Sequence, residues 1–194
     1  DAYGLIYRAY YAMIRSSLSN ADGMPTGAIY GFTNYLLRLI KDYPGDHKAV
    51  VFDSKKPTFR YDMYADYKAN REAMPDDLQQ QIPFIEKITD ALSLPRISEE
   101  GLEADDCIAH IAQRAAADGY RVYIVSRDKD LMQLVGDSVV MLAPAGDGSF
   151  EEFGPREVEK KMGVGPPLIR DFLALTCDSS DNIPGAPGGG PKTA

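Results

Sequence analysis

Hydrophobic residues recur along this chain with two different spacings, and each spacing predicts one type of element. Apolar residues at helical spacing predict helices over residues 3–17, 26–43, 74–92, 103–118, 155–162 and 167–175. Short apolar and β-branched runs predict strands over residues 49–52, 94–97, 121–126 and 138–142. Asp147-Gly148 after the last strand predicts a hairpin turn.

Strands that alternate with helices indicate an α/β fold with a mostly parallel, twisted sheet flanked by helices. In such folds, functional residues gather beyond the carboxyl ends of the strands. Asp53 and Asp128 each follow a predicted strand, and Asp1 would follow another if a strand precedes it. We therefore expect these three aspartates to lie near one edge of the sheet.

Two acidic runs stand out from the hydrophobic pattern. Glu103, Asp105 and Asp106 open a predicted helix, and Asp128 and Asp130 follow a predicted strand. Carboxylates this close resist ionisation unless a positive charge lies between them. Because hard divalent cations prefer oxygen ligands, the runs predict a divalent-metal site for phosphate chemistry. Helix capping is the alternative interpretation, since acidic side chains also satisfy the free N–H groups of a first turn.

Composition sets the broad class of the protein. The 194 residues suffice for one large domain, or one domain and part of another, and 44% hydrophobic content is ordinary for a globular protein. No apolar run reaches membrane length and no signal peptide is visible, so we expect a cytoplasmic protein without a membrane partner. The first residue is Asp, not Met, which suggests a fragment.

The net charge, the cysteines and the histidines limit the functions that the protein can have. The net charge of −8 by itself argues against a nucleic-acid partner, unless bound metal offsets the acids locally. Cys107 and Cys177 provide no disulfide framework, and Cys107 is expected to be a buried small hydrophobe. His47 and His110 lack metal-ligand spacing and are expected to be structural.

One segment reverses the acidic character of the chain. Between residues 55 and 71, basic side chains alternate with aromatic ones: Lys55, Lys56, Arg60, Lys68 and Arg71 with Phe59, Tyr61, Tyr64 and Tyr67. This mixture suits single-stranded nucleic acid, through phosphate pairing and base stacking. A solvated loop with tyrosines packed on the core is the alternative, but the nearby carboxylates favour a functional role.

The glycine-rich tail is the last segment with a chemical interpretation. It is not a P-loop, because Pro191 precedes Lys192-Thr193 where glycine is required. Ile183-Pro184-Gly185 and Gly188 to Gly190 instead match a helix-hairpin-helix turn, whose backbone N–H groups bind a DNA phosphate. A plain linker is the alternative.

These motifs, in this order, resemble the 5′-nuclease domain of bacterial DNA polymerase I, within the PIN-like nuclease group. The resemblance runs over the whole chain through these segments: Tyr7-Arg8-Ala9, Val50 to Asp53, Thr58-Phe59-Arg60, Tyr67 to Arg71, Met74 to Leu78, Gly101 to Asp106, Asp128 to Asp130, Phe172 to Leu175, and Asp178 to Gly185. It implies a PIN-like catalytic core over residues 1–165, with a helical arch near 55–80. Residues 166–194 would begin a helix-hairpin-helix region.

The resemblance also implies roles for single residues. Two metal clusters are implied, the first at Asp1, Asp53, Glu103, Asp105 and Asp106, and the second at Asp128, Asp130, Asp178 and Asp181. Lys68 and Arg71 match a catalytic basic pair near the scissile phosphate. The implied DNA-binding residues are Arg60, Tyr67, Lys68, Arg71, Gly185, Gly188, Gly190 and Lys192. The chain departs from the family pattern at four places: Ala2-Tyr3, Arg127, Cys177 and Pro191. None of these departures removes an implied metal ligand.

The expected activity is therefore that of a structure-specific 5′ nuclease in DNA replication and repair, acting from 5′ ends and at 5′ flaps and removing Okazaki primers. Implied cofactors are two divalent ions, Mg²⁺ or Mn²⁺, and a K⁺ ion at the hairpin turn. Implied partners are flapped, nicked or gapped DNA, an RNA primer, and a polymerase domain in the same parent chain, with the protein a monomer. Alternatives are a catalytically weak DNA-structure-binding module and a PIN-type ribonuclease.

Overall fold

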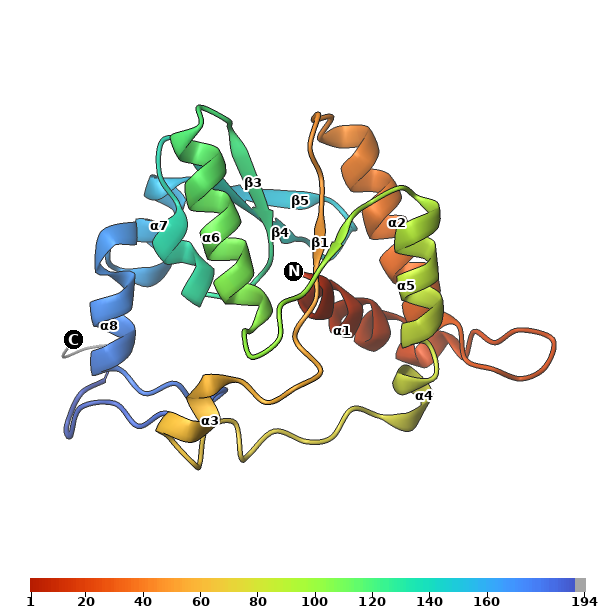
Figure 1. Ribbon diagram of the computed structural model, residues 1–194, viewed down its shortest axis with the longest axis horizontal. Helices are drawn as coiled ribbons and strands as arrows, with labels where there is room; N and C mark the ends of the chain where they lie inside the picture. The colour runs from red at the N-terminus through yellow and green to blue at the C-terminus, as the bar shows by residue number, and fades with distance from the viewer. Residues whose placement is uncertain (191–194) are drawn as a thin grey trace.

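The computed structural model describes residues 1–190, and its N-terminal half forms a helical layer beside a small sheet (Figure 1). Its elements are α1 (Ala2–Met13), the 3₁₀ helix η1 (Ile14–Ser16), α2 (Gly27–Asp42), β1 (Val50–Val51), α3 (Phe59–Met63), α4 (Asp76–Gln79), α5 (Ile82–Ala91) and β2 (Arg96–Ile97). β1 and β2 pair in parallel, with Val50 opposite Arg96. The helices predicted over residues 3–17 and 26–43 are confirmed, and both predicted strands are present but shorter than predicted.

The C-terminal half contains the longer sheet and the remaining helices. Its elements are α6 (Ala104–Ala117), β3 (Val122–Val125), the 3₁₀ helix η2 (Asp130–Leu134), β4 (Val139–Pro144), β5 (Phe150–Phe153), α7 (Pro155–Met162), the 3₁₀ helix η3 (Pro166–Leu168) and α8 (Ile169–Leu175). β3 and β4 are parallel, and β5 returns antiparallel after the turn at Asp147-Gly148. Gly148 has φ +81°, a conformation that glycine adopts without strain. The predicted hairpin is confirmed.

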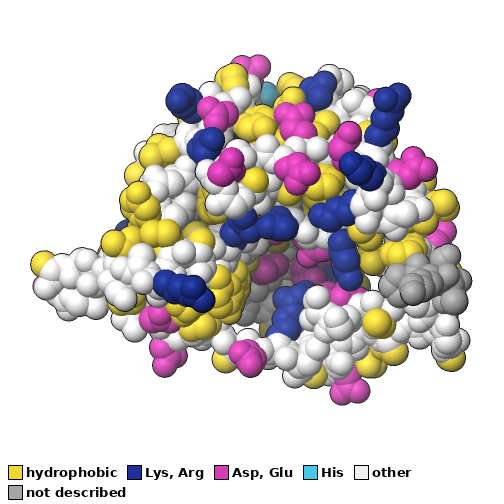
Figure 2. Space-filling model, turned by 180° about the vertical axis from the view of Figure 1, so that it is seen from behind, with side chains coloured by type: hydrophobic (Ala, Val, Ile, Leu, Met, Phe, Trp, Pro, Cys, Tyr) yellow, Lys and Arg dark blue, Asp and Glu magenta, His cyan; other side chains and the backbone are white. Residues whose placement is uncertain are grey.

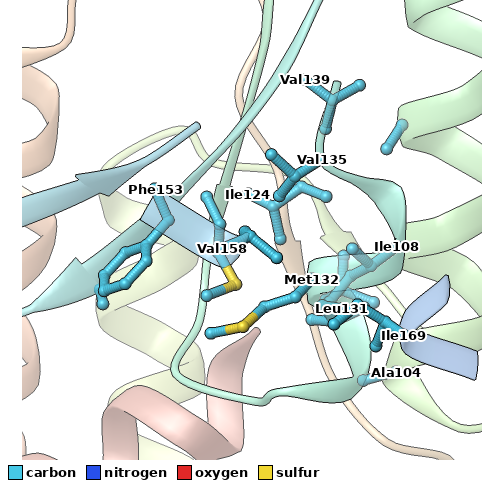
Figure 3. Packing of buried hydrophobic residues seen from close by; sticks show 14 of the residues in the cluster. Ala104, Ile108, Ile124, Leu131, Met132, Val135, Val139, Phe153, Val158 and Ile169 are labelled. Atoms are coloured by element: carbon cyan, nitrogen blue, oxygen red, sulfur yellow. The ribbon is translucent and has the colours of Figure 1, made fainter. Parts of the chain in front are cut away.

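Two hydrophobic clusters correspond to these halves. The N-terminal cluster includes Ile6 and Phe32 from α1 and α2 and Ile85 from α5. In the C-terminal cluster, side chains of α6 and η2 meet those of the β3–β4–β5 sheet and α8, as Ile108, Met132 and Ile124 show in Figure 3. Cys107 belongs to this cluster, as predicted. Strands and helices thus alternate in an α/β architecture, with two parallel pairings and one antiparallel pairing spread over two small sheets.

One predicted helix is divided in the structure. The pattern over residues 74–92 forms α4 and α5, separated at Gln80-Gln81. The Gln81 side chain is buried, and its Oε1 accepts hydrogen bonds from the N–H groups of Ala28 and Ile29. Thr26 precedes α2 as predicted, but its side chain makes no capping hydrogen bond. Gln81, in the turn between α4 and α5, accepts from the N–H groups at this end of α2 instead.

A connecting segment, residues 59–75, crosses between the two halves of the molecule. It begins with α3 beneath α6 and α8 and ends at α4 beneath α5 (Figure 1). Within the arch range predicted over residues 55–80, the structure places α3 and α4 with turns and extended chain between them. Among the described residues, no helix combines the length and apolar character needed to cross a membrane.

Candidate metal centre

Acidic side chains from several elements gather where the two halves meet. Asp1 caps α1, with Oδ1 accepting from the Gly4 N–H at 3.0 Å and Oδ2 accepting from Ser126 Oγ at 2.9 Å. Asp53 follows β1, and its Oδ1 accepts from the N–H of Ala104, the first residue of α6, at 2.8 Å. The ends of β1 and β3 therefore supply aspartates to the same region as the start of α6, as the order of elements predicts.

The closest acidic group is formed by Asp130, Asp178 and Asp181. Carboxylate oxygens of these three residues all lie within 4.8 Å of one another. Asp178 is buried, accepts from the Ser180 N–H at 3.0 Å, and lies 3.3 Å from Lys129 Nζ. Three of the four residues implied for the second cluster are thus brought together. The fourth, Asp128, accepts from the Asp130 N–H at 2.9 Å and is exposed.

Asp105 links the acids at the ends of β1 and β3 to this group. Burial, reinforced by the charges of Asp128, Asp53 and Asp130, raises the pKa of Asp105 to about 7. Burial, with the charges of Asp128, Asp178 and Asp181, raises the pKa of Asp130 to about 6. Each shift means that the ionised form lacks enough positive charge nearby.

Glu103 and Asp106 point toward cations instead. Asp106 forms a bidentate pair with Arg60, with both N···O distances 2.7 Å, and accepts the Glu103 N–H at 3.0 Å. The Arg60 hydrogen bonds hold the pKa of Asp106 below its usual range. Glu103 Oε1 lies 2.8 Å from Lys68 Nζ. These two predicted ligands of the first cluster are therefore paired with basic side chains, whereas Asp105 is not paired with any in the described residues.

The predicted basic pair and Tyr67 all contact Asp181. Arg71 donates to its Oδ1 at 2.6 Å, Lys68 Nζ lies 3.8 Å from its Oδ2, and the Tyr67 hydroxyl lies 2.9 Å from Oδ2. The same hydroxyl is 3.0 Å from Glu103 Oε2, so Tyr67 bridges one carboxylate from each implied cluster. Burial and these two carboxylates raise the pKa of Tyr67 far above its usual range.

Hydrogen bonds to backbone carbonyls hold the connecting segment against the acidic loop, residues 178–183. Lys68 N–H donates to the Asp181 carbonyl at 3.0 Å, and Asn70 Nδ2 donates to the Ser179 carbonyl at 2.7 Å. Asn182 Nδ2 donates in the opposite direction, to the Asp66 carbonyl at 2.8 Å. Lys68 adopts φ +55°, which a non-glycine residue occupies at a cost, so these contacts hold it in a strained conformation.

The donor set fits a hard divalent cation. The close group offers only carboxylate oxygens, the ligand type that Mg²⁺ and Ca²⁺ prefer. Asp130 Oδ1 is buried and has no hydrogen-bond partner among the described residues. A buried acceptor without a partner is unfavourable, and a cation at this position would satisfy it. Capping coexists with clustering, since Asp53 and Asp106 each accept an N–H at the start of α6.

The tail glycines meet the carboxyl end of α8. The Ala186 N–H donates to the Leu175 carbonyl at 3.1 Å, and a Cβ on Gly185 would lie 2.6 Å from the Cys177 nitrogen. Gly188 has φ +78°. A tight turn that favours glycine therefore follows α8, and the helix-hairpin-helix region stays a prediction. The predicted DNA-binding residue Lys192 lies outside the described residues.

Sequence patterns missed two residues that shape the centre. Lys129 supplies the cation beside Asp178, and Ser126 joins Asp1 to Asp128, since its Oγ accepts the Asp128 N–H at 3.1 Å. The sequence signal for them was their position, since Ser126 directly follows a strand and Lys129 lies between two acidic residues. Figure 2 shows the outcome at the surface: a hollow with Asp and Glu side chains inside and Lys and Arg side chains around it.

Comparisons with known proteins agree on one family. Residues 1–163 match the sequence family described as the 5′-3′ exonuclease, N-terminal resolvase-like domain. The chain is 46% identical to DNA polymerase I of Pseudomonas aeruginosa and 44% identical to the 5′-3′ exonuclease of Aquifex aeolicus, each over all of this chain. It spans 21% of the former and 65% of the latter.

A solved structure shows the same fold. It is the bacteriophage T5 D15 flap endonuclease in a pseudo-enzyme-product complex with DNA and metal ions, at a TM-score of 0.76 and 22% identity. The match covers 99% of this chain and 70% of that one.

Proposed function

The chain belongs to the family of N-terminal, resolvase-like domains of 5′-3′ exonucleases, and from this membership we propose that it is a metal-dependent, structure-specific 5′ nuclease. It hydrolyses DNA phosphodiester bonds from 5′ ends and at 5′ flaps. The observation that carries the proposal is the group of Asp130, Asp178 and Asp181, with oxygens within 4.8 Å of one another beside Asp105. A PIN-type ribonuclease is the competing assignment for such a group.

Asp130, Asp178 and Asp181 are the residues we assign to one divalent ion. Asp1, Asp53 and Asp105 would hold the other. Asp128, predicted with the group of Asp130, Asp178 and Asp181, is exposed and lies near both Asp105 and Asp130. Glu103 and Asp106 remain predicted ligands, which basic side chains contact in the structure. Oxygen-only ligands favour Mg²⁺, with Mn²⁺ a substitute. When bound, such ions supply the charge that favours hydroxide as the nucleophile and that stabilises the leaving 3′ oxygen. The products carry a 5′ phosphate and a 3′ hydroxyl.

The basic side chains of the connecting segment position the scissile phosphate. Lys68 and Arg71 offset the negative charge that develops on the scissile phosphate in the transition state. This stabilisation is largest in a site that excludes water. Lys68 is suited to this role because only 14% of its side chain is exposed and its Nζ already lies among carboxylates of both clusters. Arg60 contacts the DNA strand beside it. Tyr67, also a predicted DNA-binding residue, is buried, and its hydroxyl contacts Glu103 and Asp181 instead.

The turn after α8 binds duplex DNA away from the cut. Gly185, Gly188 and Gly190 let the backbone approach a phosphate closely, and a K⁺ ion at this turn would assist. Residues 1–165 act as the catalytic core and residues 166–194 as the start of the helix-hairpin-helix region. The protein acts as a monomer on flapped, nicked or gapped DNA, including RNA-primed Okazaki ends, with a polymerase domain in the same parent chain.

The direct test is cleavage of a labelled 5′-flap duplex. We expect cleavage with Mg²⁺ and none with EDTA, and loss of cleavage in Asp53→Ala and Asp128→Ala variants that still fold. Asp171→Ala, at an exposed position on α8, is the matched control and should cleave normally. Salt-dependent binding to flaps without cleavage would overturn the hydrolase assignment. Faster cleavage of an RNA flap than of a DNA flap would favour the PIN-type ribonuclease.

A further inference from the structure

A pocket of about 400 Å³ opens where the strands of the β3–β4–β5 sheet begin. Its lining includes Arg121 before β3, Asp137 before β4, and Glu152 on β5. We call it the strand-start pocket. The metal centre lies at the other end of β3, which Asp128 follows. Because a strand of this length spans about 13 Å, the pocket is a separate site.

The pocket belongs to the face of this sheet that points away from the C-terminal hydrophobic cluster. Tyr123 of β3 is opposite Val140 of β4, and Leu142, two residues further along β4, is opposite Glu152 of β5. Side chains alternate between the faces of a strand, so these four share one face. Tyr43, at the end of α2, covers part of it, with its ring centre 5.5 Å from that of Tyr123. No residue of α2 lines the pocket, so this helix leaves part of the face open.

The carboxylates of the pocket lack a cationic partner. Asp137, Glu152 and Glu157 all line it, and none of them forms an ion pair among residues 1–190. Glu157 accepts the Gly154 N–H at 3.0 Å, which leaves its charge uncompensated. The lining therefore carries more negative than positive charge, and it is complementary to a cation.

Aromatic rings lie beside these carboxylates. The Arg121 guanidinium is 5.5 Å from the centre of the Tyr123 ring, so this ring already accepts a guanidinium. Burial and the Glu152 carboxylate raise the pKa of Tyr43, which places that carboxylate near a second ring. Tyr123 is 38% exposed and Tyr120, next to Arg121 in the chain, is 49% exposed. Tyrosine and arginine are enriched among the residues that dominate protein–protein binding.

We propose that the strand-start pocket binds an arginine side chain on a basic segment of another protein. A guanidinium fits this lining best, because its planar group stacks on a tyrosine ring while its N–H groups donate to carboxylates. The excess of negative charge in the lining repels the DNA backbone, so the occupant is not the nuclease substrate. The partner binds at the far end of β3 from the metal centre, so it and DNA can be bound together.

The experiment measures the binding of a labelled peptide to the 194-residue chain by fluorescence anisotropy. The probe is a nonapeptide of three Gly-Ser-Arg repeats. Two control peptides carry lysine or the neutral analogue citrulline in place of arginine. Excess Mg²⁺ is present, so that the carboxylates of the metal centre do not compete for the peptide. We expect the arginine peptide to bind most tightly, the lysine peptide more weakly, and the citrulline peptide not at all.

Variants of the pocket test its charges and its ring. Asp137→Asn and Glu152→Gln each remove one charge, and each should weaken binding about 2- to 5-fold, as loss of an exposed ion pair does. Tyr123→Leu should weaken it about 2- to 5-fold through loss of the cation–π contact. Glu151→Gln is the matched control, because Glu151 is exposed and lies opposite Ala143 on the other face of the sheet. It should bind the peptide as wild type does, and circular dichroism melts check that every variant is folded.

Amide NMR shifts locate the bound peptide. Gly136 and Gly154 line the pocket, so their N–H signals should move as the arginine peptide is added. The N–H of Gly4 donates to Asp1 in the metal centre, so its signal should stay in place.

Several results would overturn the proposal. They are equal binding of the arginine and citrulline peptides, equal weakening by Glu151→Gln and Glu152→Gln, and shifts at Gly4 without shifts at Gly136 and Gly154. Tighter binding of spermidine, with shifts at the same two glycines, would assign the pocket to a polyamine instead. A dimer in sedimentation velocity that Glu152→Gln dissociates would assign it to a second copy of this chain. Flap cleavage should be the same in Glu152→Gln as in wild type, so the docking site and the nuclease proposal stand or fall separately.

Discussion

At the scale of single residues, basic side chains offset the negative charge of several carboxylates in the metal centre. Asp105 has the least positive charge near it. Its pKa is raised to about 7, so its ionised form is disfavoured in the folded protein at neutral pH. Below about pH 4 both folded and unfolded states hold the proton, and no penalty exists. As the pH rises toward 7 the unfolded state loses that proton first, so Asp105 should lower the stability of the metal-free protein increasingly.

Asp105→Asn should remove this dependence. In EDTA at pH 8 we expect the variant to unfold at a higher temperature than wild type, with roughly 4 kcal/mol as the upper bound that linkage allows. At pH 4 the two proteins should melt together. Thermal melts followed by circular dichroism at both pH values make the measurement.

The matched control is Asp171→Asn, whose side chain on α8 is 63% exposed beside Arg170. It should change stability by less than about 0.5 kcal/mol at either pH. A stability difference between Asp105→Asn and wild type that does not grow between pH 4 and pH 8 in EDTA would contradict the charge argument.

At this scale, site residues that are neighbours in the sequence could be predicted, whereas contacts between residues far apart in the sequence could not. Asp105 and Asp130 were visible because each lies in an acidic run at the edge of an element. The pairing of Arg60 with Asp106 joins residues 46 positions apart, and that of Lys68 with Glu103 joins residues 35 apart. Such contacts depend on how the elements pack, which hydrophobic periodicity does not encode.

At the scale of elements, the connecting segment is held on the acidic loop by Tyr67. Only 4% of Tyr67 is exposed, and its hydroxyl contacts Glu103 at the start of α6 and Asp181 in the loop. Tyr67→Phe keeps the ring and removes both contacts. We expect a loss of about 1.5–3 kcal/mol, the usual contribution of a hydrogen bond to a charged group. Limited proteolysis should also cut residues 59–75 faster.

Tyr61→Phe controls for the loss of a tyrosine hydroxyl. Its ring centre lies 5.6 Å from that of Tyr67, but the side chain is 43% exposed. The change should leave stability within about 0.5 kcal/mol and proteolysis unaltered. Equal sensitivity of the two variants would show that ring packing, not the Tyr67 hydroxyl, holds the segment.

The turn after α8 provides a second element-scale prediction. A Cβ on Gly185 would lie 2.6 Å from the Cys177 nitrogen and 2.7 Å from the Leu175 carbonyl oxygen. Gly185→Ala should therefore cost about 1–3 kcal/mol, as overpacking does. Hydrogen exchange should show faster exchange of the Ala186 amide, which donates to Leu175. Gly136→Ala, where a Cβ has no atom within 4 Å, should leave that amide protected.

Elements themselves were largely predictable, with errors that have a physical cause. Periodicity located α1, α2 and α6 because each is long enough to show its period, whereas the β4–β5 hairpin was predicted from the turn residues Asp147-Gly148 and β5 itself was not predicted. It merged α4 with α5, since the buried Gln81 that separates them serves α2 through a contact 53 residues away. The strands β1 and β2 were predicted too long, because only two residues of each pair.

At the scale of the whole molecule, the acids lie where two hydrophobic clusters meet. Folding thus brings together like charges in a chain whose net charge is already −8. Ligands that bind only the folded state stabilise it by mass action. Divalent ions at the centre should therefore stabilise this protein, independently of any cleavage.

Mg²⁺ should raise the melting temperature in the absence of DNA. At a free concentration about 100 times the dissociation constant, one bound ion contributes about 2.7 kcal/mol. For a domain of this size that corresponds to an increase of roughly 5–10 °C. Asp130→Asn and Asp178→Asn should lose most of this increase, because each removes a carboxylate from the close group, whereas Asp171→Asn should keep it. K⁺ at equal ionic strength should give a smaller shift. A full Mg²⁺ response in Asp130→Asn would place the ion elsewhere, since the partnerless Oδ1 of Asp130 is the atom that most requires it.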